Sequence, residues 1–196
     1  MMEMIKMIVV LTILSSFSGG LLAYIRDNTA EQIEIQQLQF VKGPAIKEIM
    51  QGAVNDPIAD RFKITDGELE RTLFVGKFDG DRKAVALETY GKGYGGDVGV
   101  MVGINVEDGT LLGVGVTTHA ETPGMGARAK DEPHFAAQFK GMATDAPFKV
   151  SNDGGQINAI SGATITSRAV SNATTEAAEI FKRLKAQIQE QANAIQ

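Results

Sequence analysis

The sequence contains no cysteine and no tryptophan, and its only histidines are His119 and His134. Without cysteine the chain cannot form a disulfide, a thiolate-bound zinc site, an iron–sulfur cluster or a C-x-x-C-H haem attachment. Two histidines are also too few for a multi-histidine metal centre, so we expect no metal site and assign both to ordinary structural roles. Any redox role therefore requires another kind of cofactor.

Basic residues are fewer than acidic ones. Among 196 residues, 24 Asp and Glu outnumber 19 Lys and Arg, and the formal net charge is -5. Such a balance offers no basic surface to a phosphate backbone, which argues against nucleic acid as a partner. Hydrophobic residues make up 43% and charged residues 22%, a composition typical of a globular protein with a sizeable core.

One long segment, 7–25, has no charged residue between Lys6 and Arg26. As a helix with ~1.5 Å rise per residue, this segment nearly matches the ~30 Å thickness of a bilayer core. A cleaved signal peptide is the alternative, with a small-x-small site at 16–18, but the apolar run continues well beyond that site. We therefore predict a retained transmembrane anchor at 1–26.

The polar stretch 27–59 has a helical pattern, with Pro44 suited to a helix start, and we interpret it as a stalk or connector. From about Asp60, hairpin signals at 79–81 and 108–109 predict an antiparallel sheet. The glycine-rich stretch 91–99 is interpreted as a loop to which no chemistry is assigned.

A short helix is expected within 132–142, followed by further strands near Phe148 and Gln156. Apolar residues then recur at three- and four-residue intervals, which predicts a C-terminal helix. This apolar stripe consists of Val170, Ala173, Ala177, Ile180, Phe181, Leu184 and Ile188. The expected fold class is α+β, with one N-terminal transmembrane helix, an antiparallel-sheet domain at 60–196 and a C-terminal helix.

Small and hydroxylated residues form the run "SGATITS" at 161–167, between an expected strand and this helix. If the helix starts near Thr166 or Ser167, its free N–H groups and its dipole favour an anion there. Gly162 and Ala163 would allow a phosphate to approach closely. Simple N-capping by Thr166 or Ser167 explains the composition equally well.

The same run resembles the S/T-G-A-T-x-S/T flavinylation signature of FMN-binding domains in bacterial respiratory complexes. The resemblance implies that FMN is attached covalently, as a phosphoester, to Thr164, the threonine after alanine. It also implies that a separate flavin transferase makes the bond from FAD with magnesium, which suits the weak nucleophilicity of a threonine hydroxyl. The other cofactor-binding residues implied here are Ser161, Gly162, Ala163, Thr166 and Ser167.

A second stretch, "ETPGMG", resembles the E-T-P-G-[LM]-G loop of the same domains. In isolation it is a tight turn after a strand, but beside the threonine motif it indicates ligand binding. Pro123 fixes one backbone angle, while Gly124 and Gly126 permit positive φ and leave backbone amides open to a planar ligand. Glu121 is a candidate for a polar contact with the flavin, and Met125 for packing on its ring. The loop residues expected at the cofactor are Glu121, Thr122, Pro123, Gly124, Met125 and Gly126.

The similarity spans nearly the whole chain and points to the family of the G subunit of the Rnf electron-transport complex. This family is related to the C subunit of the sodium-translocating NADH:quinone reductase. Membership implies an electron-carrying FMN subunit of a ferredoxin:NAD oxidoreductase that couples electron transfer to Na⁺ or H⁺ translocation. The implied partners are the other membrane, iron–sulfur and flavin subunits, the flavin transferase and the lipid bilayer. The implied location is the inner (cytoplasmic) membrane, with a single pass and the soluble domain on the extracytoplasmic side.

Two other interpretations stay open. The chain could be a membrane-anchored FMN domain that serves another respiratory reductase or a redox sensor. Alternatively, the glycine loop and the helix terminus could hold a diffusible anionic ligand reversibly. A hydrolase is disfavoured, because the sequence has no G-x-S-x-G nucleophile site.

Overall fold

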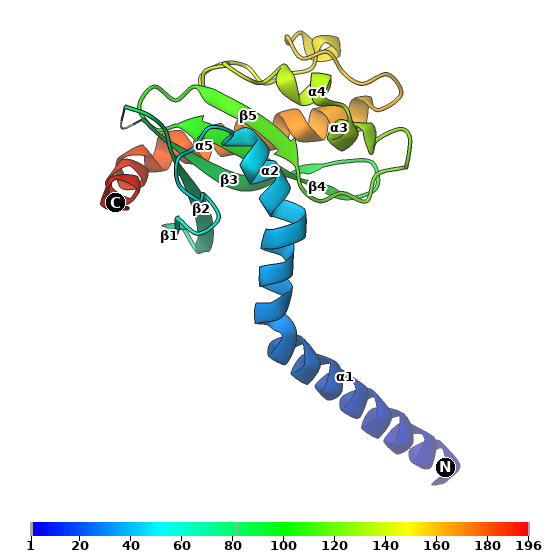
Figure 1. The fold of residues 1–196 in the computed structure, drawn as a ribbon. Helices are drawn as coiled ribbons and strands as arrows, with labels where there is room; N and C mark the ends of the chain where they lie inside the picture. The colour runs from blue at the N-terminus through cyan, green and yellow to red at the C-terminus, as the bar shows by residue number, and fades with distance from the viewer. Residues whose placement is uncertain (1, 81, 196) are drawn as a thin grey trace. The chain divides into compact units, whose positions relative to one another are not determined.

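The computed structural model describes residues 2–80 and 82–195. Two compact units are present, one ending at Gln39 and the other beginning at Phe40, and each is described by itself. Figure 1 labels their helices and strands.

The first unit consists of the long helix α1 (Met2–Gln36), in which no side chain is buried. Its part 7–25 is apolar on every side, and a helical segment of this kind with no buried side chain is typical of a membrane span. Within the described residues, one helical stretch, Met2–Ile49, is long and apolar enough to cross a membrane. This stretch contains the charge-free run 7–25, and its retention as an anchor stays a prediction. A short π-helical segment, η1 (Gln37–Lys42), follows α1.

The second unit opens with α2 (Gly43–Ile49), which has Pro44 in its first turn, as predicted. Ile46 and Ile49 are buried as α2 packs on β4 and β5. Residues 40–59 of the predicted connector belong to the second compact unit, in which α2 packs on strands. The three-part division at residues 26 and 59 stays a prediction.

A five-stranded antiparallel sheet forms the body of the second unit, in the order β1-β2-β3-β4-β5. Its strands are β1 (Arg61–Asp66), β2 (Leu69–Lys77), β3 (Lys83–Lys92), β4 (Asp97–Asn105) and β5 (Leu111–Val116). Gly80 and Gly109 adopt positive φ in the turns before β3 and β5, as both hairpin signals require. Asp81, part of the first signal, lies outside the described residues. The α+β fold predicted from the sequence is confirmed.

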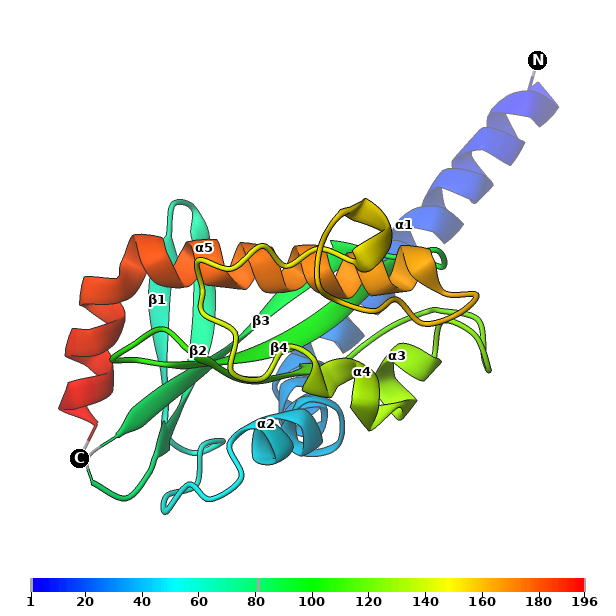
Figure 2. The ribbon, with the colours of Figure 1, turned by 90° about the horizontal axis from the view of Figure 1, so that it is seen from above.

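The last helix, α5 (Thr164–Ala194), lies across one face of the sheet, whereas α2 covers the other (Figures 1 and 2). Every member of the predicted apolar stripe is buried, and the main core lies between this stripe and the strands. Contact with β3 is close: Thr89 Oγ1 donates a hydrogen bond of 2.8 Å to the Ala173 carbonyl. The Cα of Gly91 faces the backbone of Ala169 so closely that a Cβ would overlap the Ala169 carbonyl.

The strands predicted near Phe148 and Gln156 are wrong. In this region the structure has only an isolated parallel bridge between Val150 and Ile157, separated by the 3₁₀ turn η2 (Ser151–Asp153). Phe148 instead stacks on Phe139, with ring centroids 6.4 Å apart, inside the main core. The apolar side chains of this loop are buried in the core, so the sequence has the apolar pattern of a strand. The backbone nevertheless forms no ladder with a neighbouring strand. The helix predicted within 132–142 is present as α4 (Pro133–Ala137), preceded by the short α3 (Arg128–Asp131).

Asp66, at the end of β1, ties the edge of the sheet to α5 through two arginines. Arg183 donates three hydrogen bonds of 2.8–3.1 Å to its carboxylate, and Arg71 Nε donates one of 2.9 Å. These guanidinium groups, Arg183 first, hold the pKa of the Asp66 carboxyl below its ordinary value. The stabilisation is therefore present above the unfolded-state pKa of about 3.9 and is lost as pH falls through the lower folded-state pKa.

We expect Asp66→Asn to lower the free energy of unfolding at neutral pH by about 1–3 kcal/mol, because charge-assisted hydrogen bonds to a side chain only 10% exposed are weakened. Urea denaturation at pH 7 and at a series of values below about 4 would measure this. The difference between wild type and variant should shrink toward acid. Asp145→Asn is the control, since Asp145 is 85% exposed in its pair with Lys182. An equal loss in both variants would contradict the prediction.

Candidate functional site

The site is built around the start of α5. This helix begins at Thr164, two residues earlier than expected, and no side chain among the described residues caps it. Gly162 lies before the helix with φ of +80°. Ala163, at the N-cap position, has no side-chain oxygen that could accept hydrogen bonds from the free N–H groups. The uncapped first turn therefore presents backbone N–H groups and the positive end of the helix dipole.

The capping interpretation of Thr166 and Ser167 is wrong, because both hydroxyls lie inside the helix and bind elsewhere. Ser167 Oγ donates to the Ala163 carbonyl at 3.0 Å and accepts from the Ile160 N–H at 3.0 Å. Thr166 Oγ1 donates to Glu121 Oε2. Ile160 does not end a strand but lies in the loop before α5. The hydrogen bond between the Ile160 N–H and Ser167 Oγ connects this loop to the helix.

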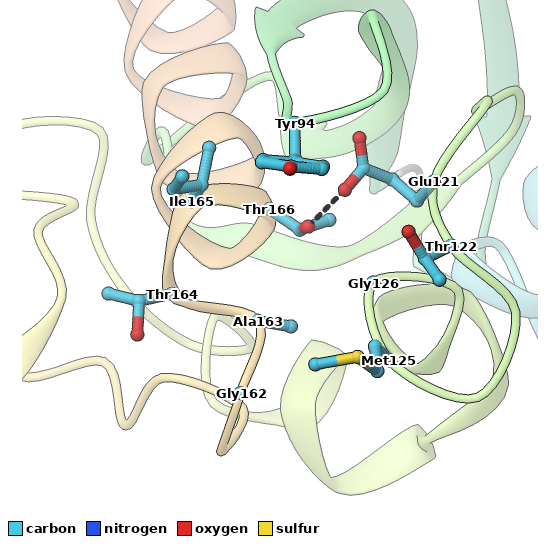
Figure 3. A pocket seen from close by; sticks show the side chains of 10 residues that line it. All are labelled: Tyr94, Glu121, Thr122, Met125, Gly126, Gly162, Ala163, Thr164, Ile165 and Thr166. Carbon is cyan, nitrogen blue, oxygen red and sulfur yellow. Dashed lines mark hydrogen bonds between the residues drawn. The ribbon is translucent and has the colours of Figure 1, made fainter.

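A cavity of about 500 Å³ opens beside this helix start. Three separate segments form its wall: a glycine loop after β3, the "ETPGMG" turn after β5, and the first turn of α5 (Figure 3). Its lining residues are Tyr94, Glu121, Thr122, Met125, Gly126, Gly162, Ala163, Thr164, Ile165 and Thr166. The two motifs singled out in the sequence, more than 30 residues apart, thus meet in one cavity.

Glu121 connects the three segments. It is only 6% exposed, and its Oε1 accepts a hydrogen bond of 2.8 Å from the Gly95 N–H. Its Oε2 accepts the hydroxyl of Thr166, as Figure 3 shows. A Cβ at Gly126 would lie 2.5 Å from Glu121 Oε2 and 2.9 Å from Thr166 Oγ1, so a glycine is needed there. Both carboxylate oxygens are therefore engaged within the protein.

The expected site residues divide into two groups. The cavity is lined by Thr164, Gly162, Ala163, Thr166, Glu121, Thr122, Met125 and Gly126, but not by Ser161, Ser167, Pro123 and Gly124. Pro123 and Gly124 are exposed in the turn, where Gly124 has φ of +74°. Ser161 is exposed, and Ser167 faces the protein interior. Whether each residue binds a cofactor stays a prediction.

Sequence reasoning missed two lining residues, Tyr94 and Ile165. Tyr94 belongs to the glycine-rich stretch to which the sequence pattern assigns no chemistry, yet this loop closes on the "ETPGMG" segment. A Cβ at Gly95 would overlap the carbonyl of Ala120. An aromatic side chain enclosed by glycines on both sides was the available signal in the sequence.

Two arginines lie near the helix start. Arg128 Nη1 donates to the Ser161 carbonyl at 3.1 Å, and its Nε donates to Glu132 at 2.6 Å. Arg168 forms two hydrogen bonds of 2.7 and 2.8 Å with Asp153, and this guanidinium lowers the pKa of the Asp153 carboxyl. His119 Nδ1 accepts the Glu121 N–H at 3.3 Å, which is an ordinary backbone contact.

These features suit a ligand that carries a phosphate and a flat apolar body. An uncapped helix start preceded by small residues suits a phosphate, while Tyr94, Met125 and Ile165 offer apolar surface of the kind that a ring packs on. FMN has both parts, so the chemistry of the lining residues suits it. No group of three or more His, Cys, Asp or Glu side chains that could hold a metal ion is found among the described residues.

The fold and the site define an FMN-binding domain, and the family model described as "FMN-binding domain" matches residues 93–179. That match covers the glycine loop, the "ETPGMG" turn and the first half of α5.

Similarity to curated proteins extends along almost the whole chain. The G subunit of the ion-translocating oxidoreductase complex of Vibrio cholerae is 32% identical over 195 residues, covering 94% of this chain and 93% of the relative. The corresponding G subunit of Escherichia coli K12 is 34% identical over 193 residues, covering 92% of each chain. The chain belongs to the family of G subunits of ion-translocating oxidoreductase complexes.

Among solved structures, the C subunit of the Na⁺-translocating NADH-quinone reductase from Parabacteroides distasonis is similar, with a TM-score of 0.51 and 23% identity. The match covers 70% of this chain and 74% of that one. At this level of identity it shows a shared fold.

Proposed function

We propose that this chain is the electron-carrying FMN subunit of a membrane ferredoxin:NAD oxidoreductase that couples electron transfer to Na⁺ or H⁺ translocation. Family membership and the FMN-binding domain support the flavoprotein role. The bound flavin would supply the redox chemistry, and the protein residues would position it. Other membrane, iron–sulfur and flavin subunits are the proposed electron partners, so the chain has no separate substrate of its own.

The attachment point that we propose is Thr164 Oγ1. Four hydroxyls lie in the motif, and hydrogen bonding separates them. Those of Thr166 and Ser167 are buried and engaged by Glu121 and Ala163, whereas Thr164 is half-buried, lines the cavity and has no side-chain hydrogen bond to any described residue. Ser161 is exposed but does not line the cavity. The free, cavity-lining hydroxyl of Thr164 is the observation that carries the proposal.

The linkage would form by phosphoryl transfer from FAD, catalysed by a separate flavin transferase with magnesium. Thr164 Oγ1 attacks the phosphorus that bears riboflavin, and the P–O bond of the pyrophosphate breaks. AMP leaves with the bonding electron pair. The proton of the hydroxyl passes to a base of the transferase. No base of this chain contacts the Thr164 hydroxyl within the described residues, which supports the need for an external enzyme. The free N–H groups at the start of α5 would then bind the phosphodiester oxygens.

The mass of the intact protein tests this proposal. Protein purified from a strain that has the flavin transferase should be heavier, by one FMN less one water, than protein from a strain that lacks it. Equal masses in the two strains, together with FMN that is released on denaturation, would show reversible binding of an anionic ligand instead of covalent attachment. Equal masses and no flavin at all would contradict the flavoprotein role.

We also propose that α1 anchors the chain in the inner (cytoplasmic) membrane with the second unit on the extracytoplasmic side. Protease added to intact spheroplasts should then digest the second unit and leave a membrane-embedded N-terminal fragment, since α1 is the candidate span. A cytoplasmic marker protein serves as the control for intact membranes. Digestion only after the membrane is broken would reverse the orientation.

A further inference from the structure

Three large apolar side chains of the second unit gather around one cavity although all are exposed. Tyr94 is 76% exposed, Met125 49% and Ile165 46%, and each lines the cavity beside Thr164. They come from three different segments of the chain, so sequence proximity does not explain the cluster. Apolar surface that converges on a cavity usually marks the place where a ligand covers it.

The loop that carries Tyr94 is held in place by Glu121. The Gly95 N–H donates to Glu121 Oε1, and the Gly93 N–H donates to the Gly96 carbonyl at 2.8 Å, closing the loop on itself. A Cβ at Gly93 would collide with Glu121, and one at Gly95 with the backbone of Ala120. The glycines therefore let the loop pack against the "ETPGMG" segment with Tyr94 projecting at the cavity.

Tyr94 and Met125 lie at opposite ends of the group of cavity-lining side chains, and the first turn of α5 lies to one side of them (Figure 3). We infer that Tyr94 is the aromatic wall against which the flavin ring stacks, with Met125 on the other side, and that Glu121 is a positioning residue that fixes Tyr94. The inference rests on the proposed FMN site. It assigns chemistry to the glycine loop and gives Glu121 an internal role in place of the direct flavin contact expected from the sequence.

Stacking has a measurable signature, because a tyrosine ring in van der Waals contact with a flavin quenches the fluorescence of the flavin. The native flavinylated protein should fluoresce weakly and brighten on denaturation. Tyr94→Ala should raise the native fluorescence toward the denatured level, whereas Tyr94→Trp should keep it quenched, since an indole also stacks. Tyr90→Ala is the matched control: Tyr90 is likewise exposed, at 52%, but bonds Glu88 and does not line the cavity.

In-gel flavin fluorescence of the denatured proteins separates the two hypotheses. If wild type and Tyr94→Ala both carry covalent flavin but have equal native fluorescence, the role of Tyr94 is overturned while the FMN site stands. If wild type carries no flavin, the proposed function itself fails.

Glu121 variants test the positioning role. Glu121→Gln keeps an acceptor for the Gly95 N–H and can donate to Thr166 Oγ1, so its native fluorescence and flavin absorbance should match wild type. Glu121→Ala loses both bonds and should brighten as Tyr94→Ala does, while retaining flavin on denaturing gels. If Glu121→Gln instead shifts the flavin absorbance as much as Glu121→Ala, the carboxylate charge acts on the flavin directly and the positioning role is overturned.

Discussion

Replacing Thr164 with alanine is expected to abolish covalent flavin while leaving the fold intact. The substitution removes the one motif hydroxyl that both lines the cavity and is free of the internal hydrogen bonds that engage Thr166 and Ser167. Alanine is also a good helix former, and Thr164 provides no cap to lose. In-gel flavin fluorescence after denaturation should fall to background. The helix start would still attract phosphate, but a dipole contribution of ~0.3–1 kcal/mol does not replace a covalent bond.

Three further variants complete this experiment. Ser161→Ala should retain full fluorescence, because Ser161 does not line the cavity. Thr166→Ala should retain covalent flavin, but it frees one oxygen of the buried Glu121 carboxylate and should lower the free energy of unfolding by about 1–3 kcal/mol. Thr164→Ser keeps a hydroxyl, so failure of this variant would show that the transferase recognises the methyl group. Persistent fluorescence in Thr164→Ala would disprove the attachment site, and loss only in Thr166→Ala would move it two residues along.

Gly91→Ala is expected to cause the largest loss of stability among single-methyl substitutions in the sheet. Its Cβ would overlap the carbonyl of Ala169, a backbone atom of α5 that cannot turn aside as a side chain can. Either β3 or the first turns of α5 must move, and overpacking of this kind costs about 1–3 kcal/mol even where flexible side chains absorb it. We expect a lower midpoint in thermal and urea unfolding, and weaker flavinylation because the displaced helix begins at Thr164.

Gly113→Ala is the matched control, since it adds the same methyl group to a strand glycine. Its Cβ would lie 3.8 Å from the nearest atom, Ile49 Cγ1, which is an ordinary van der Waals contact. The free energy of unfolding should stay unchanged or rise slightly, as glycine in a strand carries an entropic cost. Equal unfolding midpoints for Gly91→Ala and Gly113→Ala would show that β3 and α5 can separate without cost.

The sequence was sufficient to predict the hairpins and the last helix, because residues close together in the chain determine these elements. The hairpins follow from Asp-Gly turns, and α5 follows from an apolar stripe that must be buried. The start of α5 was predicted two residues too late. Thr164 and Thr166 are the same residue type, so helix propensity cannot distinguish them as the first helical residue. The helix start depends instead on the hydrogen bonds that Ser167 and Glu121 form in the folded protein. The strands expected near Phe148 and Gln156 are wrong for a different reason: a strand needs a ladder with a neighbouring strand, and in the described part of the chain these two segments make only the single bridge between Val150 and Ile157.

The two motifs indicated most of the candidate site, since each places small residues next to one another in the chain. Tyr94 could not be predicted in the same way. Its loop reaches the cavity through a bond between Gly95 and Glu121, which are 26 residues apart. A pattern in a single sequence carries no information on which oxygen a distant N–H group will find. The role of the glycines became visible only in the close approach of two backbones.

The uncapped start of α5 also links ligand binding to folding. A helix that lacks an N-cap oxygen loses about 0.5–2 kcal/mol relative to one that has it, and α5 is the helix on which the main core is built. An anion that accepts hydrogen bonds from those N–H groups in the folded state has no equivalent partner in the unfolded chain. Because these hydrogen bonds form only in the folded state, they stabilise that state and raise the melting temperature, whether the anion is tethered or free. The domain without its ligand would therefore have a lower free energy of unfolding than the domain with it. Increased resistance to unfolding and to proteolysis would then indicate that the ligand has been attached.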